Sequence, residues 1–72
     1  MLPEKLVYMA NQIGKFFAHK SDDEAIAGIA EHIKSFWEKR MLKEIYDYLD
    51  ADGAGLDDRP KRALQHLRET VD

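Results

Sequence analysis

Two stretches of this chain repeat one apolar pattern, and that repeat constrains the fold more than any other feature of the sequence. Residues 9–17 read MANQIGKFF and residues 29–37 read IAEHIKSFW, so bulky residues occupy positions one, five, eight and nine of each copy. At about 100° per residue these positions fall on one arc of roughly 120°. The repeat therefore predicts two amphipathic helices. Their apolar arcs are Leu6, Met9, Ala10, Ile13, Phe16 and Phe17 in the first, and Ile26, Ile29, Ala30, Ile33, Phe36 and Trp37 in the second.

Local signals set the bounds of these two helices. Pro3 suits a first helical turn, so the first helix is expected over residues 3–18. Ser21 and Glu24 have the spacing of a capping box, which predicts a second helix over 22–36. A short polar loop separates the two, so they should close as an antiparallel hairpin. Gly14 lies at the border of the first arc, where it would allow another backbone to approach closely.

The rest of the chain predicts one or two more helices. Residues 38–49 carry an apolar side made of Met41, Leu42, Ile45, Tyr48 and Leu49. Residues 50–55 contain two glycines, which supply left-handed conformations that end a helix. A last helix over 58–71 has a thinner stripe of Leu64, Leu67 and Val71, with Asp57 or Asp58 as its cap and Pro60 in its first turn. No strand pattern is present. The expected fold is all-α, a small compact bundle of three to four helices in a single domain over residues 1–72.

Size and composition limit the class of protein. A chain of 72 residues buries only about 60% of the surface that its unfolded form exposes. With no cysteine, disulfides and thiolate metal sites are excluded, so docking to a partner or self-association is favoured. The net charge of −3 comes from 11 basic and 14 acidic residues that are mixed along the chain, which disfavours a nucleic-acid binder. No apolar run reaches about 20 residues and no signal-peptide pattern opens the chain, so we expect a cytoplasmic protein without membrane contact.

Two patterns raise the question of a metal site. Asp50, Asp52 and Gly55 match positions one, three and six of an EF-hand loop, but Ala54 and Lys61 stand where position five and the bidentate Glu should be. A capped turn between helices is the better interpretation. His19, His32 and His66 share no ligand spacing. We therefore predict no metal ligands.

The inventory for catalysis is equally poor. The chain has only three aliphatic hydroxyl groups that could act as nucleophiles, and no general base lies at an evident spacing from any of them. They belong to Ser21, Ser35 and Thr70. Glu31 and His32 are adjacent, so they point about 100° apart on a helix. No glycine-rich phosphate loop is present. We predict no catalytic and no cofactor-binding residues, and a chain that is not an enzyme by itself.

Several side chains are not required by the hairpin and are candidates for binding a partner. The rear face of the second helix carries the small residues Ala25, Gly28 and Ser35, which would let another element pack closely. Tyr8 lies opposite the first apolar arc, either as a lone surface tyrosine or as an interface residue. Trp37 and Arg40 meet at a helix junction, either as core packing with a stacked arginine or as a binding hot spot. His32 should be a partly buried imidazole beside Phe36, hydrogen-bonded to a neighbouring group.

Three runs of residues resemble a known family. They are residues 6–17 with the sequence LVYMANQIGKFF, residues 25–33 with AIAGIAEHI, and Phe36-Trp37 followed by Arg40-Met41. They are similar to the delta subunit of bacterial NAD-dependent, molybdenum-containing formate dehydrogenase, over about residues 2–67. Helical amphipathicity requires the apolar positions of these runs, but it does not require Asn11, Gln12, His32 or Arg40.

The sequence departs from the family pattern at two helix starts. The family usually reads Trp-Asp-Pro-Arg-Met at the junction, where this chain has Trp37-Glu38-Lys39, so the cap of the third helix should be weaker. The family has Leu-Asp-Pro before the last helix, where this chain has Leu56-Asp57-Asp58 and its proline at position 60. Both changes concern capping.

The resemblance implies a non-catalytic accessory subunit of a complex that oxidises formate and reduces NAD. Its partners would be the large molybdenum-containing catalytic subunit and the flavin-bearing subunits. The complex would use molybdopterin guanine dinucleotide, iron–sulfur clusters, FMN and NAD, with no cofactor in this chain. The implied role is assembly, stabilisation or cofactor maturation; the alternative is a free-standing homo-oligomeric helical adaptor. The predicted partner-binding residues are Tyr8, Asn11, Gln12, Gly28, His32, Ser35, Trp37 and Arg40.

Overall fold

A computed structural model describes residues 2–70, and these residues form four helices and no strand. The helices are α1 (Pro3–Phe16), α2 (Asp22–Phe36), α3 (Lys39–Asp50) and α4 (Asp58–Thr70). The prediction of a small all-α bundle is confirmed. Among the helices described, none is long and apolar enough to span a membrane.

The helix ends follow the local chemistry. Ser21 caps α2: its Oγ accepts a hydrogen bond from the Glu24 backbone N–H (3.3 Å) and donates one to the Glu24 carboxylate (3.2 Å). Glu38 precedes α3 without a side-chain cap, as expected from the missing Asp-Pro pair. α1 stops at Phe16, two residues before the expected end, because the Phe17 and Ala18 N–H groups turn back to carbonyls three residues earlier. The last residue of the expected fourth helix, Val71, lies outside the described residues.

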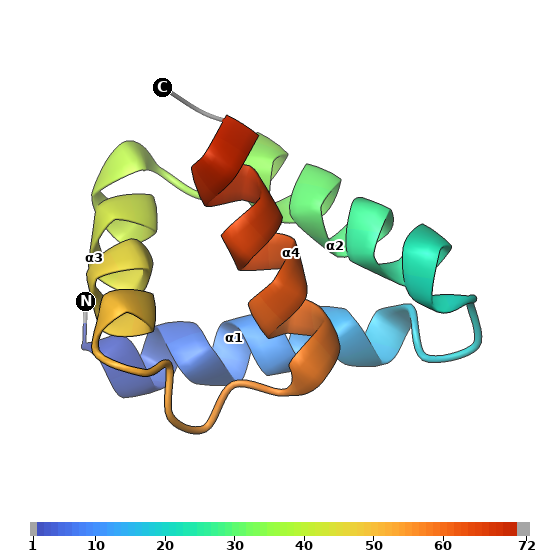
Figure 1. Cartoon of the computed structure of the whole chain (residues 1–72), viewed down its shortest axis with the longest axis horizontal. Coiled ribbons are helices and arrows are strands. Elements are labelled where there is room, and N and C mark those ends of the chain that lie inside the picture. The colour runs from blue at the N-terminus through green and yellow to red at the C-terminus, as the bar shows by residue number, and fades with distance from the viewer. Residues whose placement is uncertain (1, 71–72) are drawn as a thin grey trace.

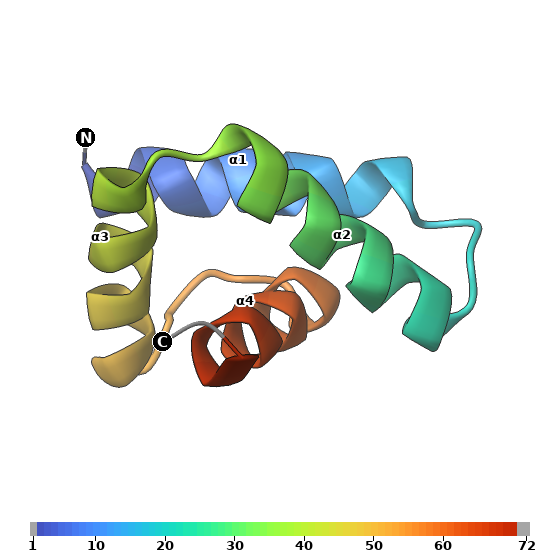
Figure 2. The same ribbon diagram turned by 90° about the horizontal axis from the view of Figure 1, so that it is seen from above.

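The first two helices form an open hairpin. Figure 1 shows that α2 slopes away from α1 after the turn at residues 17–21, and that α4 crosses the opening between them. α2 packs most extensively against α4 and much less against α1. α3 stands at the open end, beside the N-terminal part of α1 in both views (Figures 1 and 2). The predicted hairpin is therefore a wedge that the last helix fills.

One apolar core joins the four helices. It gathers the inward residues of both predicted arcs, Trp37 among them, together with Ile45 and three residues of α4. Its buried members are Leu6, Ala10, Ile13, Ile29, Ala30, Ile33, Trp37, Ile45, Ala63, Leu64 and Leu67. Pro60 is also fully buried. Because α4 contributes so much of this core, its apolar stripe is broader than the spacing of Leu64 and Leu67 indicated.

Three residues lie where the helical arcs did not place them. Phe16 and Phe36 were expected in the core, but their side chains are 74% and 72% exposed. Each precedes another aromatic residue, Phe17 or Trp37, and neighbours on a helix point about 100° apart, so only one of each pair can face inward. Ala25 was expected on an open rear face and is completely buried.

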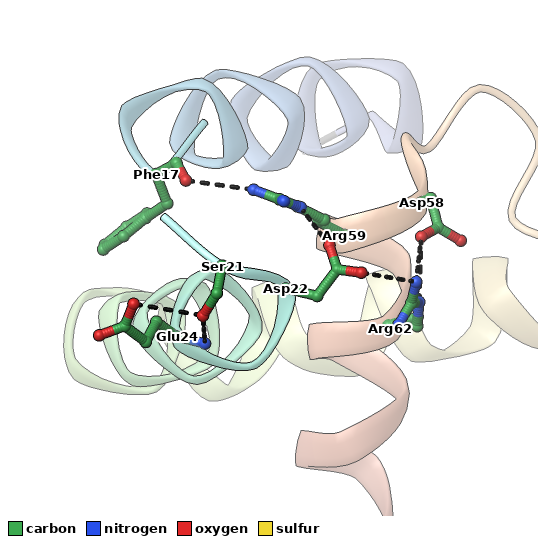
Figure 3. Close-up of polar contacts among 7 residues, drawn as sticks. All are labelled: Phe17, Ser21, Asp22, Glu24, Asp58, Arg59 and Arg62. Atoms are coloured by element: carbon green, nitrogen blue, oxygen red, sulfur yellow. Dashed lines mark hydrogen bonds and ion pairs between the residues drawn. The ribbon is translucent and has the colours of Figure 1, made fainter. Parts of the chain in front are cut away.

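Ion pairs attach the start of α4 to the turn between α1 and α2 (Figure 3). Arg59 donates from Nε to the Asp22 carboxylate (2.9 Å) and from Nη1 to the Phe17 carbonyl (3.2 Å). Arg62 pairs with Asp58 (2.7 Å) one turn earlier on α4 and lies 3.9 Å from Asp22. Arg62 holds the pKa of Asp58 below its usual value, mainly through the hydrogen bond between them. These contacts fix the direction in which α4 enters the wedge.

Candidate functional site: an aromatic groove between three helices

A shallow groove of about 410 Å³ lies where α1, the end of α2 and the start of α3 meet. We call it the aromatic groove. It is lined by Tyr8, Met9, Gln12, Ile13, His32, Phe36, Trp37 and Met41. Ile13 and Trp37 belong to the buried core, so they form its floor. The groove therefore has a rigid apolar base.

Two aromatic side chains stand at the surface of the aromatic groove. Tyr8 is 64% exposed and Phe36 is 72% exposed, although both are large apolar groups. The Phe36 ring contacts the His32 ring, with centroids 4.7 Å apart and planes inclined by 36°. Rings presented to solvent beside a partly covered methionine, Met9 or Met41, are typical of a protein-binding surface.

The polar groups of the aromatic groove are available for a ligand. Gln12 and His32 are half-buried, and within residues 2–70 neither side chain makes a hydrogen bond. A partly buried His32 beside Phe36 was predicted, but its expected hydrogen bond to a neighbour is replaced by the ring contact. The groove thus combines an apolar base with an amide and an imidazole that can bind a partner's polar atoms.

Four of the eight predicted partner-binding residues meet in this groove: Tyr8, Gln12, His32 and Trp37. Arg40 lies next to the groove residue Met41 and is exposed. Trp37 is 7% exposed, so of its two interpretations core packing is the one observed. The stacked arginine is absent: within the described residues Arg40 makes no ring contact and no ion pair. That these residues contact a partner stays a prediction.

Asn11 has a function inside the fold that the sequence interpretation missed. Its Nδ2 donates to the Gly55 carbonyl (3.0 Å) and its Oδ1 accepts from the Asp57 backbone N–H (2.9 Å). Both partners are more than forty residues away, in the loop that leads into α4. The helical hairpin itself does not require this side chain, but the loop before α4 is bound by it. Local periodicity carries no signal for such a contact, because it depends on which loop lies beside α1.

The small rear face of α2 is also used internally. A Cβ at Gly28 would lie 2.4 Å from Phe17 Cε1, so the Phe17 ring occupies the space that the missing side chain leaves. Ala25 is buried, and Ser35 donates a hydrogen bond to Glu31 Oε2 (3.3 Å) on its own helix. The close packing predicted for Gly28 is real, but its partner is this chain's own aromatic residue. A bulky Gly28 variant would displace Phe17 and would not test partner binding alone.

Four residues of the aromatic groove were not singled out from the sequence: Met9, Ile13, Phe36 and Met41. All four were assigned to apolar faces. The available signal for Phe36 was its position directly before Trp37, which forces one of the two rings away from the core.

The described residues contain no candidate metal centre. Among residues 2–70, no three His, Cys, Asp or Glu side chains are placed to hold a metal ion. The loop with partial EF-hand spacing is a turn, in which Asp52 (φ 101°) joins Gly53 (φ 67°) and Gly55 (φ 91°) in left-handed conformations. The Asp50 carboxylate of that loop is bound by Arg68.

Comparison with known proteins identifies the family. Neither the curated proteins nor the solved structures give a match to this chain. The model of one protein family matches residues 5–64, a range that contains every residue of the aromatic groove, the Asn11 contacts and the start of α4. The family is described as the NADH-dependent formate dehydrogenase delta subunit FdsD, and this chain belongs to it.

Proposed function

We propose that this chain is a non-catalytic accessory subunit of an NAD-dependent formate dehydrogenase complex, and that it acts by binding the other subunits. Assembly, stabilisation and cofactor maturation are the three forms that this action can take. In this proposal the molybdenum, iron–sulfur and flavin cofactors are held by the other subunits, and the aromatic groove is a contact surface. The observation that carries the proposal is the family match, which spans both sides of the groove.

The physical properties of the chain support a binding role. A 72-residue domain is small enough to gain substantially from a partner. Its groove presents exposed aromatic rings and unpaired polar groups without a nucleophile–base pair beside them. Such a surface offers contact area and hydrogen bonds, which are what a docking subunit supplies.

The homo-oligomeric adaptor depended on the rear face of α2, and that surface is taken up inside the chain. Ala25 is buried and Gly28 is covered by Phe17. Sedimentation of the isolated protein tests this alternative directly. We expect a monomer at micromolar concentration.

A tagged chain recovered from the cells that produce it tests the accessory-subunit proposal. We expect it to bring down a complex that contains molybdenum and flavin and that oxidises formate with NAD. Recovery of the chain alone under gentle conditions, together with an intact and fully active formate dehydrogenase in cells lacking the chain, would overturn the proposal.

Cells lacking the chain also distinguish the three forms of the function. Dissociated subunits on a native gel would indicate assembly. A complex of full size but low molybdenum content would indicate cofactor maturation. A complex of normal composition that falls apart faster on heating would indicate stabilisation.

A further inference from the structure

The basic residues of this acidic chain gather in the segments that build the aromatic groove. α1 and residues 32–43 contain six of the 11 basic residues but only two of the 14 acidic ones, Glu4 and Glu38. The six are Lys5, Lys15, Lys34, Lys39, Arg40 and Lys43. The remaining residues are correspondingly acidic. The mixed charge seen along the sequence is therefore separated between groove-building segments and the rest of the fold.

Within residues 2–70, these six cations make no ion pair with the chain's own carboxylates. The ion pairs of the described residues involve Arg59, Arg62 and Arg68, all on α4, and none of these six cations. Lys5 lines a second apolar hollow together with Glu4, Tyr8 and Met9, and the last two of these residues also line the groove. Arg40 precedes the groove residue Met41 and is exposed. No Asp, Glu, Lys or Arg side chain lines the groove itself, so the nearest cations stand at its edges.

We propose that the aromatic groove binds an acidic amphipathic segment of another subunit of the complex. Apolar side chains of that segment would cover Tyr8 and Phe36 and reach the floor at Trp37. Its carboxylates would face Lys5 and Arg40, and its polar groups would bond to Gln12 and His32. This inference rests on the proposed function, because it names the chemistry of the partner that an accessory subunit would bind.

Charge selects this occupant over two others. A second copy placed groove to groove would bring the same cations together, which is unfavourable. A nucleic acid would match the cations. The apolar floor and the two exposed aromatic rings, however, are complementary to a segment with apolar side chains. An acidic amphipathic segment is complementary to both features.

Binding measurements with matched variants test the proposal. The probe is the formate dehydrogenase purified from cells that lack this chain, and the titrant is the purified chain. Phe36→Ala and Tyr8→Ala should each weaken binding about tenfold or more, as truncation of an interface aromatic does. Phe16→Ala is the control: Phe16 is as exposed as Phe36 but does not line the groove, and this variant should bind within about twofold of the original chain.

Charge reversal tests the acidic character of the partner. Lys5→Glu and Arg40→Glu should each weaken binding and reduce its dependence on salt. Lys20→Glu changes the net charge equally at an exposed site in the α1–α2 turn and should bind within about twofold. Carbodiimide, which joins amines to carboxylates without a spacer, should link Lys5 or Lys39 to an Asp or Glu of another subunit.

The outcomes separate this inference from the proposed function. If the original chain does not bind the enzyme, the groove inference is overturned; the proposed function is overturned as well if cells lacking the chain contain an intact and fully active enzyme. If the original chain binds and the groove variants bind equally well, the inference that the groove is the docking surface is overturned and the proposed function stands. If charge reversal has no effect, or if the groove binds single-stranded RNA or a second copy in preference to the enzyme, the acidic segment is overturned.

Discussion

At the scale of single residues, the Asn11 side chain connects α1 to the loop before α4 through hydrogen bonds. Its amide bonds both the Gly55 carbonyl and the Asp57 N–H, which orients the first turn of α4. Each intramolecular hydrogen bond contributes about 0.5–1.5 kcal/mol. We expect Asn11→Ala to lower the free energy of unfolding by about 1–2 kcal/mol, measured by urea denaturation.

The neighbouring amide provides the control for this prediction. Gln12 is the same kind of side chain on the same helix, but it makes no hydrogen bond within the described residues. Gln12→Ala should change the free energy of unfolding by less than about 0.5 kcal/mol. Equal effects of the two substitutions would show that the Asn11 contacts do not stabilise the fold.

Gly14 is a point at which α4 packs closely against α1. A Cβ at this position would lie 2.7 Å from Pro60 Cγ and 3.2 Å from Pro60 Cδ. The proline ring is rigid and fully buried, so it cannot move aside as a flexible side chain would. Overpacking costs about 1–3 kcal/mol, whereas Ala gains only about 1 kcal/mol over Gly in a helix.

We therefore expect Gly14→Ala to destabilise the protein even though it improves the helix propensity of α1. A double-mutant cycle with Pro60→Ala isolates the contact. In the Pro60→Ala background the clash is removed, so Gly14→Ala should become neutral or stabilising. A stabilising Gly14→Ala in the original chain would mean that α4 does not approach α1 in this way.

At the scale of elements, α3 and α4 are joined by Arg68. Its Nη2 donates to Asp50 Oδ2 (2.7 Å), its Nη1 contacts Asp50 Oδ1, and Nη1 also donates to the Tyr46 carbonyl (3.3 Å). The hydrogen bond from Arg68 is the main cause that holds the pKa of Asp50 below its usual value, and its charge acts in the same direction. Burial raises the pKa of the nearby Tyr46 phenol, and Arg68 partly opposes that effect.

The lowered pKa of Asp50 gives a signed dependence on pH. In the acid range the folded chain holds fewer protons at Asp50 than the unfolded chain, so this pair stabilises the fold above the unfolded pKa of about 3.9. The contribution is lost as the pH falls through the folded pKa. Arg68→Gln should therefore be less stable than the original chain at pH 7, with the difference shrinking in strong acid.

A titration of the side-chain carboxyl carbons by NMR checks the cause. Arg68→Gln should return the pKa of Asp50 toward its ordinary value and leave that of Asp58 low. Arg62→Gln should do the reverse, because Asp58 is held by Arg62. An unchanged pKa of Asp50 in the Arg68 variant would show that the pair does not persist in solution.

The elements also show what the sequence could and could not predict. Capping chemistry is local, so Ser21 and Glu24 placed the start of α2 correctly. The arcs identified most of the core, but periodicity cannot decide which of two adjacent aromatics turns inward, and Phe16 and Phe36 were misplaced. Gly28 was correctly expected to allow close packing, yet only the fold shows that Phe17 fills the space.

The candidate site was predicted in part for the same reason. Tyr8, Gln12 and His32 were noticed because an amphipathic helix does not need them, and the fold brings them into one groove. Asn11 met the same criterion, but the structure shows that it stabilises the loop before α4. The sequence could not show this, because the contacts join residues more than forty positions apart. Separation of charge between the groove segments and the rest is likewise visible only once the groove is known.

At the scale of the whole molecule, the repeat that dominates the sequence does not make an independent hairpin. α2 packs most extensively against α4, which supplies Ala63, Leu64 and Leu67 to the core. A fully buried leucine contributes about 1.5–3 kcal/mol, and a domain of this size has a total stability of about 4–11 kcal/mol. The leucines of α4 alone are thus comparable to the lower end of that range.

We therefore expect a chain that ends at Gly55 to lose cooperative folding, although it keeps the whole repeat and every residue of the aromatic groove. Circular dichroism should show a broad, non-cooperative loss of helix on heating, because the wedge between α1 and α2 is left open. A peptide of residues 56–72 added in excess should restore a cooperative transition, since it can refill that wedge. A sharp transition in the shortened chain alone would mean that α1, α2 and α3 fold without α4. The groove would then be formed by α1, α2 and α3 and would not depend on the last helix.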